Sequence, residues 1–436
     1  MMMQNRRKST QRERLLAGMV AIANSGGYAS ANVSAVIGEA GVSRPTFYEY
    51  FADKDECFLA ALADVQERLA GEIRQAVESR AGEHALQATI GALVGFASSE
   101  PAMARFLMSE AMAGGPRALD ARDEWIGEIE EMIEEAHEQV PPATAIPDVS
   151  PRIVIGGTYR LLASRLRRGE PGLSALQEDL LGWIKSYELP AGESQWRSLQ
   201  PGPAPTPSPF LPETALRAPP GLPPGRPRLS EEQVAWNHRQ RILFAAAQLA
   251  EKKGYTATTI LDITKAAGID GRAFYAAFAD KQDAFMAVHE LGFQEVMAVT
   301  ARAFFAEASW PERSWEAGRA FTQFLERNPT ITHVGFVEAY AVGPGAVQRV
   351  EDSHTAFTIF LQEGYQYAPR ADPPSRVVLE AIITSVFEIV YRQARASGEP
   401  EIAGLLGHIA FLWLAPFVGA EEANALIEGK AAGAAG

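Results

Sequence analysis

Residues 40–54 decide the fold, and they read Ala40-Gly41-Val42-Ser43-Arg44-Pro45-Thr46-Phe47-Tyr48-Glu49-Tyr50-Phe51-Ala52-Asp53-Lys54. The chain repeats the pattern at residues 267–281, as Ala267-Gly268-Ile269-Asp270-Gly271-Arg272-Ala273-Phe274-Tyr275-Ala276-Ala277-Phe278-Ala279-Asp280-Lys281. Gly41 and Gly268 each follow a short apolar run, at the place where a left-handed residue ends a helix. Ser43 and Asp270 are good N-caps, so a second short helix should begin directly after each glycine turn.

The second short helix should have an inner and an outer face. Phenylalanines four residues apart are expected on the inner face of both copies: Phe47 with Phe51, and Phe274 with Phe278. The tyrosine after each first phenylalanine must then point elsewhere. Asp53 and Asp280 are expected to cap a further helix, which places Lys54 and Lys281 at a positively polarised helix N-terminus. Such an end is a natural seat for a phosphate group.

Two short helices joined by a glycine turn, the second with a polar outer face, form a helix-turn-helix, whose second helix can enter the major groove of DNA. The chain resembles the N-terminal DNA-binding domain of the TetR family of transcriptional regulators at Gly27-Tyr28, Val33, Val36, Ala40-Gly41-Val42, Phe47-Tyr48, Phe51 and Asp53-Lys54. The second copy is similar to the same pattern at Gly254-Tyr255, Ile260, Ile263, Ala267-Gly268-Ile269, Phe274-Tyr275, Phe278 and Asp280-Lys281. The alternative is a helical hairpin inside some other bundle.

The length and composition set the class of protein. The chain has 436 residues, which favours two or three domains. We expect a cytoplasmic protein without a membrane partner, because the sequence has no apolar run of membrane length and has a polar, basic N-terminus in place of a signal peptide. Cys57 is the only cysteine, which excludes an intrachain disulfide and a thiolate metal cluster.

Positive charge is concentrated in two segments of this acidic chain. Residues 1–54 carry seven Lys or Arg against four Asp or Glu, and residues 226–281 carry nine against six. Each segment therefore has a net charge of +3, and since the whole chain has −14, the remainder carries −20. Two basic ends on an acidic body are what a DNA-binding protein with a separate sensing body requires.

The duplication extends through the whole chain. Three pairs of segments align without a gap: residues 12–62 with 239–289, 101–116 with 329–344, and 169–171 with 398–400. Neither half shows convincing strand alternation. We therefore predict an all-α fold of two tandem TetR-like units, each a small three-helix helix-turn-helix domain followed by a helical body.

The two units are joined by a proline-rich segment. Residues 189–229 hold twelve prolines, which indicates a semi-extended linker. Its reach, roughly 100 Å at about 3.1 Å per residue, does not dictate which faces of the units meet. The basic residues near the two helix-turn-helix domains resemble minor-groove arms, and solvated charges beside a linker are the alternative: Arg226 and Arg228, and Arg6, Arg7 and Lys8.

The resulting domain prediction has six parts. They are helix-turn-helix domain 1 (residues 10–55), regulatory body 1 (56–188), the linker (189–229), an eroded helix-turn-helix domain 2 (230–282), regulatory body 2 (283–420) and a flexible C-terminal tail (421–436). The last two helices of each body are expected at residues 151–168 with 173–187 and at 375–396 with 400–417, and they carry long apolar stripes. In the TetR family the corresponding helices form a four-helix dimer interface. The resemblance therefore implies that this chain forms that interface within itself, as an intramolecular pseudo-dimer.

No catalytic constellation is present in the sequence, so we do not expect an enzyme. The seven histidines are scattered, and no P-loop, nucleophile elbow or dinucleotide fingerprint occurs, so neither a metal nor another cofactor is predicted. Glu110 and Glu338 recur in matching places among apolar residues, where they either face a cavity or make fold-supporting hydrogen bonds. The resemblance implies a small apolar effector in this region, and core packing is the alternative for its candidate residues: Phe106, Glu110, Trp125, Phe336, Glu338, Tyr340 and Phe357.

We expect a ligand-responsive transcriptional repressor whose two helix-turn-helix units address neighbouring major grooves of one DNA operator. In the first unit the candidates are Arg44 and Thr46 for base edges, with Tyr48, Tyr50 and Lys54 for phosphates. In the second unit they are Arg272 for base edges, with Tyr275 and Lys281 for phosphates. An effector bound to the bodies would change the separation of the reading helices from the roughly 34–36 Å that adjacent half-sites require, and DNA would be released.

The second copy departs from the pattern. Asp270 places a negative charge where Ser43 is neutral, Gly271 weakens the reading helix, and the alanines at 276 and 277 remove the aromatic contact that Tyr50 offers in the first copy. We predict that the second copy binds DNA more weakly and that the operator is asymmetric. The rival hypothesis is a ligand-binding or protein-interaction module that keeps the tandem fold but has lost DNA binding.

Overall fold

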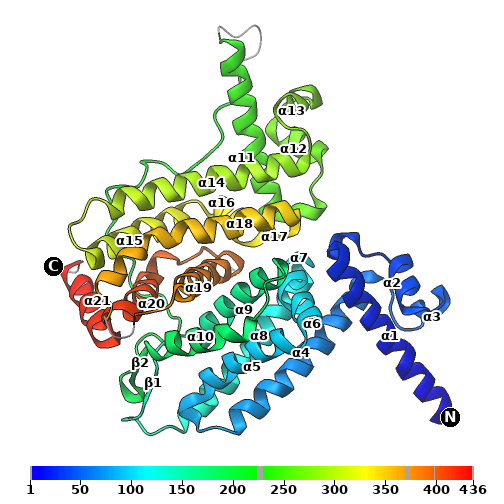
Figure 1. Ribbon diagram of the computed structural model, residues 1–436. Coiled ribbons are helices and arrows are strands. Elements are labelled where there is room, and N and C mark those ends of the chain that lie inside the picture. The colour runs from blue at the N-terminus through cyan, green and yellow to red at the C-terminus, as the bar shows by residue number, and fades with distance from the viewer. Residues whose placement is uncertain (1, 223–228, 370–372, 397, 435–436) are drawn as a thin grey trace. The chain divides into compact units, whose positions relative to one another are not determined.

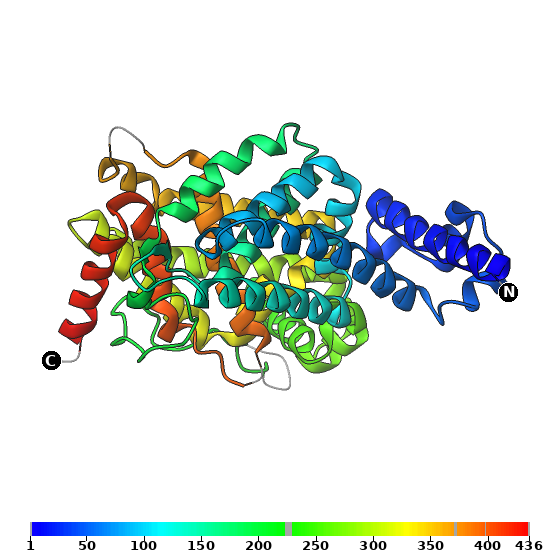
Figure 2. The ribbon, with the colours of Figure 1, turned by 90° about the horizontal axis from the view of Figure 1, so that it is seen from below.

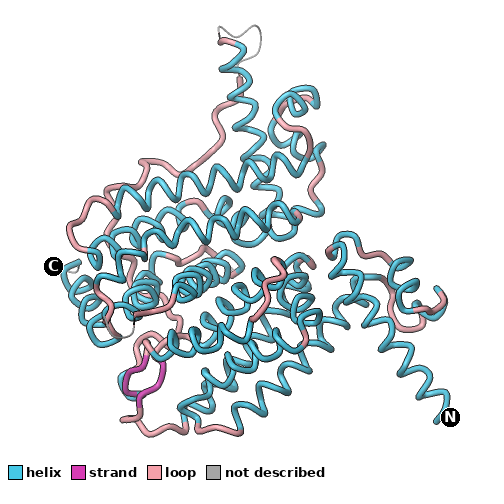
Figure 3. Tube along the Cα trace, in the orientation of Figure 1, coloured by secondary structure: helices cyan, strands magenta, loops and turns pink. Residues whose placement is uncertain are grey.

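The computed structural model describes residues 2–222, 229–369, 373–396 and 398–434. The chain divides into two compact units. Unit 1 comprises Met1–Ser198 with Pro374–Ser385, and unit 2 comprises Leu199–Pro373 with Val386–Gly436. Almost all of the regular structure is helical, as Figure 3 shows, which confirms the prediction of an all-α fold.

The elements of unit 1 follow the predicted order of a three-helix domain and a helical body (Figure 1). They are α1 (Met2–Gly26), η1 (Tyr28–Ser30), α2 (Val33–Ala40), α3 (Arg44–Tyr48), α4 (Lys54–Glu78), η2 (Gly82–His84), α5 (Ala85–Ser99), α6 (Pro101–Arg105), η3 (Phe106–Glu110), α7 (Ala111–Ala113), α8 (Pro116–Glu138), β1 (Ala145–Pro147), α9 (Pro151–Arg167), η4 (Leu173–Ala175), α10 (Leu176–Lys185), β2 (Glu188–Pro190) and η5 (Ala191–Glu193).

Unit 2 repeats the order of helices. Its elements are α11 (Glu231–Ala257), α12 (Ile260–Ala267), α13 (Gly271–Ala277), α14 (Lys281–Phe304), α15 (Trp310–Arg327), α16 (Pro329–His333), η6 (Val334–Glu338), α17 (Ala339–Val342), α18 (Pro344–Phe357), η7 (Thr358–Phe360), η8 (Gln362–Gln366), α19 (Arg376–Arg395), η9 (Ala403–Leu405), α20 (Leu406–Val418) and α21 (Ala420–Ala434). The first half of α19 belongs to unit 1 and its second half to unit 2.

Each small N-terminal domain is held together by an apolar core at helical spacing. In unit 1, α1 packs on α2 and α4, and the buried side chains include Leu15, Met19, Val36, Phe47 and Phe51. In unit 2, α11 packs on α12, α13 and α14, and the corresponding side chains are Ile242, Ala246, Ile263, Phe274 and Phe278. The short helix expected to end at each glycine turn is present, as α2 before Gly41 and α12 before Gly268.

The bodies are layers of longer helices. In unit 1, α4 packs against α5 and α8, and α5 packs against α9 and α10. Figure 2 shows the blue helices α1 to α3 as a lobe that joins this body through α4. In unit 2, α14 packs against α15, which also contacts α20. The predicted last helices of both bodies are present as α9 and α10, and as α19 and α20.

Both bodies contain a π-helix at the same place in the repeat, η3 in unit 1 and η6 in unit 2. A π-helix is a rare departure from the α-helical ladder, and it is frequently found at functional sites. Here each one ends at the glutamate that the sequence singled out, Glu110 or Glu338. The feature therefore recurs together with this glutamate in both repeats.

The proline-rich segment makes specific contacts that its composition did not predict. Its first part belongs to unit 1, where β2 pairs antiparallel with β1 and the Asp148 carboxylate accepts the backbone N–H groups of residues 195–197. Its later part lies on unit 2, where Gln323 Oε1 accepts the N–H of Ser208 at 2.8 Å and Asn328 Oδ1 accepts that of Leu216 at 2.6 Å. The side-chain amides of α15 and Asn328 satisfy backbone groups that a proline-rich chain cannot pair with itself.

The two ends of the chain also differ from expectation. Most of the expected flexible tail, residues 421–436, lies in α21 (Ala420–Ala434), because Ala423 and Ile427 are buried against neighbouring helices. At the other end α1 begins at Met2, so Arg6, Arg7 and Lys8 lie in a helix rather than in an extended arm. The residues before the predicted start at residue 10 include no helix breaker.

Candidate nucleic-acid interface

The turn of the first helix-turn-helix has the predicted geometry. Gly41 has φ 59° and ψ 42°, the left-handed conformation that ends α2, and the N–H of Val42 donates to Ile37 O at 3.2 Å. Ser43 then caps α3, because its Oγ accepts the N–H of Thr46 at 3.3 Å. Gly41 tolerates the left-handed conformation because it has no Cβ, and Ser43 has the extended backbone that is typical of an N-cap.

The second copy has the same turn. Gly268 ends α12 with φ 62° and ψ 42°. Asp270 caps α13, since its Oδ1 accepts the N–H of Ala273 at 2.8 Å. A capping box of Thr259 and Asp262 also fixes the start of α12. Gly271 does not prevent the helix from forming, and α13 runs to Ala277.

The inner and outer faces of α3 and α13 carry the predicted side chains. Phe47, Phe51, Phe274 and Phe278 are buried in their domain cores. The side chains of Tyr48 and Tyr275 are 52% and 62% exposed, and Arg44 and Arg272 are exposed as well. Both copies therefore present an arginine and a tyrosine to solvent on the outer face of the second short helix, where a DNA backbone and base edges can be reached.

Two further candidates of the first copy are less available. The hydroxyl of Thr46 lies 2.8 Å from Ser43 Oγ, so it takes part in the cap of α3. Tyr50 lies between α3 and α4, is half-buried, and has its ring centroid 6.3 Å from that of Phe51. The side chains of Thr46 and Tyr50 therefore lie at the edge of the outer face of α3 and not at its centre.

The lysines at the starts of α4 and α14 interact with the tyrosine after each Gly-Tyr turn. Lys54 Nζ lies 4.4 Å from the centroid of the Tyr28 ring, and Lys281 Nζ lies 4.0 Å from that of Tyr255. Lys281 also donates to the carbonyl oxygen of Tyr255 at 2.9 Å, and burial together with the charge of Lys253 lowers its pKa. Both lysines are at a helix N-terminus as expected, and the aromatic partner of each is an interaction that sequence reasoning missed.

The remaining candidates for DNA contacts are the basic arms. Arg226 and Arg228 lie outside the described residues. Arg6, Arg7 and Lys8 lie in α1, as noted above. Contact of these residues with DNA therefore remains a prediction from the sequence.

Glu110 and Glu338 connect each body to its DNA-binding domain. The Glu110 carboxylate accepts the backbone N–H of Tyr28 at 2.9 Å, and the Glu338 carboxylate accepts that of Tyr255 at 2.6 Å. The preceding residue in each case is a glycine with positive φ, Gly27 or Gly254. Of the two interpretations of these glutamates, the fold-supporting hydrogen bond is the one the structure contains, and it joins residues 82 or 83 positions apart.

Burial of the Glu110 carboxylate has an electrostatic consequence. Removal from water raises its pKa, while the Tyr28 N–H and the charges of Arg105 and Arg167 act in the opposite direction. The side chain is 9% exposed and lies at the end of η3. The body thus holds a carboxylate with a perturbed pKa against the turn that leads into the helix-turn-helix.

The aromatic candidates for an effector site are largely core residues. In unit 1, Phe106 packs on Phe58 with ring centroids 5.1 Å apart, and Trp125 Nε1 donates to Gln66 O at 3.2 Å. In unit 2, Phe336 and Phe357 line a cavity of about 40 Å³, which has room for about one water molecule. Tyr340 is also buried. The structure does not bring these residues together around a cavity of ligand size among the described pockets.

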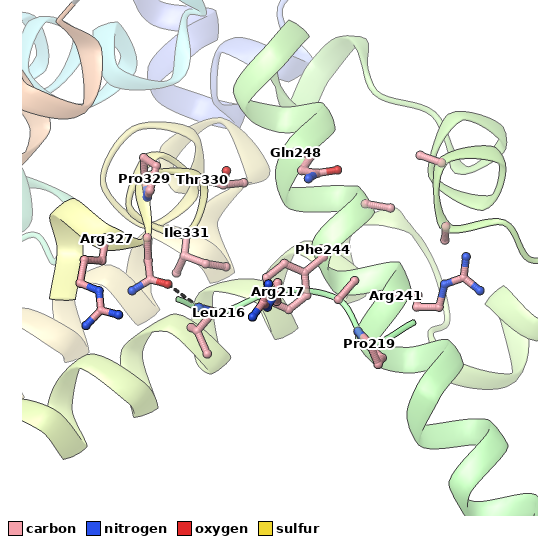
Figure 4. A pocket seen from close by; sticks show the side chains of 15 residues that line it. Leu216, Arg217, Pro219, Arg241, Phe244, Gln248, Arg327, Pro329, Thr330 and Ile331 are labelled. Carbon is pink, nitrogen blue, oxygen red and sulfur yellow. Dashed lines mark hydrogen bonds between the residues drawn. The ribbon is translucent and has the colours of Figure 1, made fainter. Parts of the chain in front are cut away.

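A wider groove lies in unit 2, as Figure 4 shows, and its lining includes the end of the proline-rich segment. It has a volume of about 280 Å³. Arg241 and Arg327 lie on opposite sides, and Arg217 lies between them beside Phe244. The residues that line it include no acid. Sequence reasoning missed this basic groove, because Arg217 is brought to it by the contact between Leu216 and Asn328.

Metal-binding and membrane-spanning features are absent from the part of the chain that the structure describes. No group of three or more His, Cys, Asp or Glu side chains in that part of the chain is placed to hold a metal ion. No helix there combines the length and apolar character needed to cross a bilayer. The features that recur in both repeats are the exposed face of the helix-turn-helix and the glutamate at the Gly-Tyr turn.

Two helix-turn-helix domains, each carrying an exposed arginine and tyrosine on a helical body, define a DNA-binding regulator. The sequence model of the family described as bacterial regulatory proteins, tetR family, matches the chain twice, at residues 15–61 and 242–288. Each of the two helix-turn-helix domains thus belongs to the TetR family, and the chain contains the family's DNA-binding domain in tandem. A tandem pair of these domains supports a DNA-binding transcription regulator.

Solved structures of the family are similar to about one repeat of this chain. A regulatory protein of the tetR family from Rhodococcus RHA1 is 23% identical, with a TM-score of 0.34 over 42% of this chain and 96% of its own. The fatty acid degradation regulator FadR from Bacillus halodurans is 17% identical, with a TM-score of 0.36 over 40% and 94%. A gamma-butyrolactone receptor, an ArpA-like protein, is 17% identical, with a TM-score of 0.33 over 46% and 99%. No curated protein sequence matches the chain.

Proposed function

We propose that the chain is a repressor that holds one operator with both of its helix-turn-helix domains and is released by a small apolar effector. The observation that carries the proposal is the exposed face formed twice by the same kind of residues, Arg44 with Tyr48 and Arg272 with Tyr275. In this proposal the arginines read base edges and the tyrosines contact phosphates. Thr46, Tyr50, Lys54 and Lys281 add contacts beside them.

The two domains are proposed to contribute unequally. In the second copy Lys281 is already engaged by Tyr255, and the positions after Tyr275 are occupied by alanines. Fewer side chains are therefore free to meet phosphates, and the acidic cap at Asp270 opposes an anionic partner. An asymmetric operator follows from this difference. Footprinting checks it, because equal protection of two inverted identical half-sites would refute the asymmetry.

We further propose that the last helices of the two bodies pair as an intramolecular pseudo-dimer. Support comes from unit 1, which includes residues 374–385 of the second repeat. Within that unit Arg165 Nη2 lies 2.7 Å from Glu380 Oε2, and Gly157 approaches Ser385 so closely that an added Cβ would lie 2.9 Å from its backbone nitrogen. One chain should then bind one operator, which mass photometry of the complex measures.

A gel shift at several salt concentrations tests the central proposal, with the promoter region of the chain's own gene as the DNA. A regulator that makes several phosphate contacts must lose affinity steeply as salt rises. Arg44→Ala should weaken the complex, whereas the control Arg74→Ala, which removes an exposed arginine of α4, should not. The rival hypothesis of a module that has lost DNA binding would be supported by the absence of a retarded complex at the lowest salt.

A further inference from the structure

Unit 1 contains a pocket at the place where the helix-turn-helix domain meets the body. Its volume is about 540 Å³, within the range of small-molecule sites. The end of α1, the start of α6 and the loop between α9 and α10 all contribute to its lining. We call it the junction pocket. It is separate from Phe106 and Trp125, where the effector was expected.

The walls of the junction pocket are mainly apolar. Ala97, Leu166 and Leu173 are buried lining residues, and Pro101 and Pro171 are lining residues at the rim. Glu170 is the one acidic residue among the described lining residues, and it is already paired, with Arg165 Nη1 at 2.6 Å and with Arg168 Nε at 2.8 Å. An apolar ligand therefore meets little competing negative charge.

Arg105 supplies a positive charge to this pocket, and the same charge acts at longer range on the buried Glu110 carboxylate. Its guanidinium makes no hydrogen bond or ion pair with any described residue, and its Nε is a buried atom without a partner. A guanidinium in a partly buried, mainly apolar site is incompletely solvated, so a bound carboxylate would be favoured there. Asn24 also lines the pocket and donates through Nδ2 to Ala102 O at 2.7 Å, which ties α1 to the start of α6.

The corresponding place in unit 2 has different chemistry. A pocket of about 340 Å³ there is lined by Glu251, Pro329 and His333, the counterparts of Asn24, Pro101 and Arg105. His333 is already used, since its Nδ1 lies 3.1 Å from Ala394 O and its Nε2 lies 3.6 Å from Glu338 Oε1. Glu251 adds a negative charge. Arg395 also lines this pocket, with its guanidinium carbon 5.8 Å from the centroid of the Tyr391 ring. The hollow is thus retained in both repeats, but its charged groups differ: in unit 2 the cation Arg395 and the acid Glu251 both line it, and His333 stands in place of Arg105.

We propose that the junction pocket binds an apolar monocarboxylate, with the carboxylate paired to Arg105 and the apolar part against Leu166 and Leu173. The proposal deepens the proposed function, on which it rests, by naming the site and the chemical class of the effector. Arg105 ends α6, and η3 leads from it to Glu110, which holds the N–H of Tyr28. A ligand on Arg105 therefore acts one element away from the hydrogen bond that joins the body to the DNA-binding domain.

Calorimetric titration of the full chain tests the site, with 4-phenylbutyrate as the acid and 4-phenylbutan-1-ol as its neutral counterpart. Wild type should bind the acid at least about tenfold more tightly than the alcohol, and Arg105→Met should remove this preference. Ala102→Phe should weaken both ligands by filling the mouth. The matched controls are Arg74→Met and Ala63→Phe on the exposed face of α4, which should change neither affinity.

The outcomes separate this proposal from the proposed function. Absence of acid binding to wild type, or acid binding that survives both Arg105→Met and Ala102→Phe, would overturn the site. In the gel shift, the acid should lower DNA affinity for wild type but not for Arg105→Met, and an unchanged affinity with the acid bound would overturn its role as effector site. The protein could also fail to bind DNA at every salt concentration while the acid and the alcohol bind wild type and the variants as expected. That result would contradict the proposed repressor function and would still support the ligand site.

Discussion

At the scale of the residue, the hydrogen bond from the N–H of Tyr28 to the Glu110 carboxylate is one of the contacts that join the body to the DNA-binding domain. It occurs again between Tyr255 and Glu338, in a repeat whose neighbouring residues differ. The carboxylate is retained although its burial raises the pKa of Glu110, so the charged form is held in the folded protein at a cost. That cost gives a measurable pH dependence.

We expect Glu110→Gln to change how stability depends on pH. Because burial raises the pKa of Glu110 in the folded state above the ordinary value of about 4.5, the native protein binds this proton more readily than the unfolded chain. The contribution of Glu110 to stability is therefore present below pH 4.5 and is lost as pH rises through the folded pKa. The amide does not titrate, so the stability of the variant relative to wild type should increase with pH across this window.

Chemical denaturation of both proteins at several pH values measures this difference. Glu67→Gln, at an exposed position of α4, serves as the control for the loss of one negative charge. A stability difference between wild type and Glu110→Gln that stayed constant with pH would show that Glu110 does not titrate in this way.

A second residue-scale prediction concerns the two exposed arginines. Arg44→Ala should cost about 1–3 kcal/mol of DNA binding free energy and relax sequence preference at one position of the operator, as expected for loss of a base contact. Arg272→Ala should cost less, because the second copy offers fewer accompanying contacts. Fluorescence anisotropy with operator variants measures both. An equal loss for the two variants would contradict the proposed asymmetry.

At the scale of the element, each helix-turn-helix depends on a left-handed glycine. Gly41 has φ 59°, and an added Cβ would lie 2.5 Å from Arg14 Nη2, which itself donates to Gly41 O at 3.0 Å. Gly38, three residues earlier in α2, is exposed, and an added Cβ there would meet nothing within 4 Å. The two glycines thus differ in conformation and in available space.

We expect opposite effects of alanine at these two positions. Gly41→Ala should destabilise unit 1 by about 1–2 kcal/mol, because alanine is strained in the left-handed region. Gly38→Ala should stabilise it by up to about 1 kcal/mol through helix propensity. Thermal unfolding followed by circular dichroism measures both. Similar effects of the two substitutions would mean that the turn does not depend on the left-handed conformation.

Elements set by neighbouring residues could be predicted from the sequence, and those set by distant contacts could not. The glycine turn, the caps at Ser43 and Asp53 and the buried Phe47 follow from residues within one or two helical turns of each other. Helix α21 and the path of the proline-rich segment depend on surfaces supplied by other elements, such as Gln323 and Asn328 of unit 2.

The candidate site shows the same division. The exposure of Arg44 and Tyr48 follows from local helical periodicity. The contact of Lys54 with the ring of Tyr28 does not, because these two residues are 26 positions apart in the chain. The junction pocket joins α1, α6 and the loop after α9, and its key residue, Arg105, has no neighbouring residue pattern that marks it. Pattern analysis cannot find a site whose members meet only after the body has folded.

At the scale of the whole molecule, the two sequence repeats do not coincide with the two compact units. Pro374–Ser385 belongs to the second repeat in sequence and to unit 1 in space. Its contacts in unit 1 include the ion pair of Glu380 with Arg165 and the close approach of Ser385 to Gly157 in α9. A substitution at Gly157 therefore probes whether this segment packs there.

We expect Gly157→Ala to destabilise the protein although alanine favours helix. The added Cβ would lie 2.9 Å from the backbone nitrogen of Ser385, so α9 or α19 must shift, a kind of overpacking that typically costs about 1–3 kcal/mol. Gly182→Ala in α10, where an added Cβ meets nothing within 4 Å, is the matched control and should stabilise by up to about 1 kcal/mol. Calorimetric unfolding compares them, and a stabilising Gly157→Ala would count against the packing and against the pseudo-dimer.

The assignment of α19 to both units bears on how such a gene can evolve. A duplicated regulator whose copies remained separate could lose or exchange either copy by recombination. Here, a gene truncated to its first half would encode unit 1 without residues 374–385. Transfer of the second half to another gene would carry these residues away from unit 1. Both copies must then be inherited together, which allows one DNA-reading helix to diverge while the chain that carries it cannot be discarded.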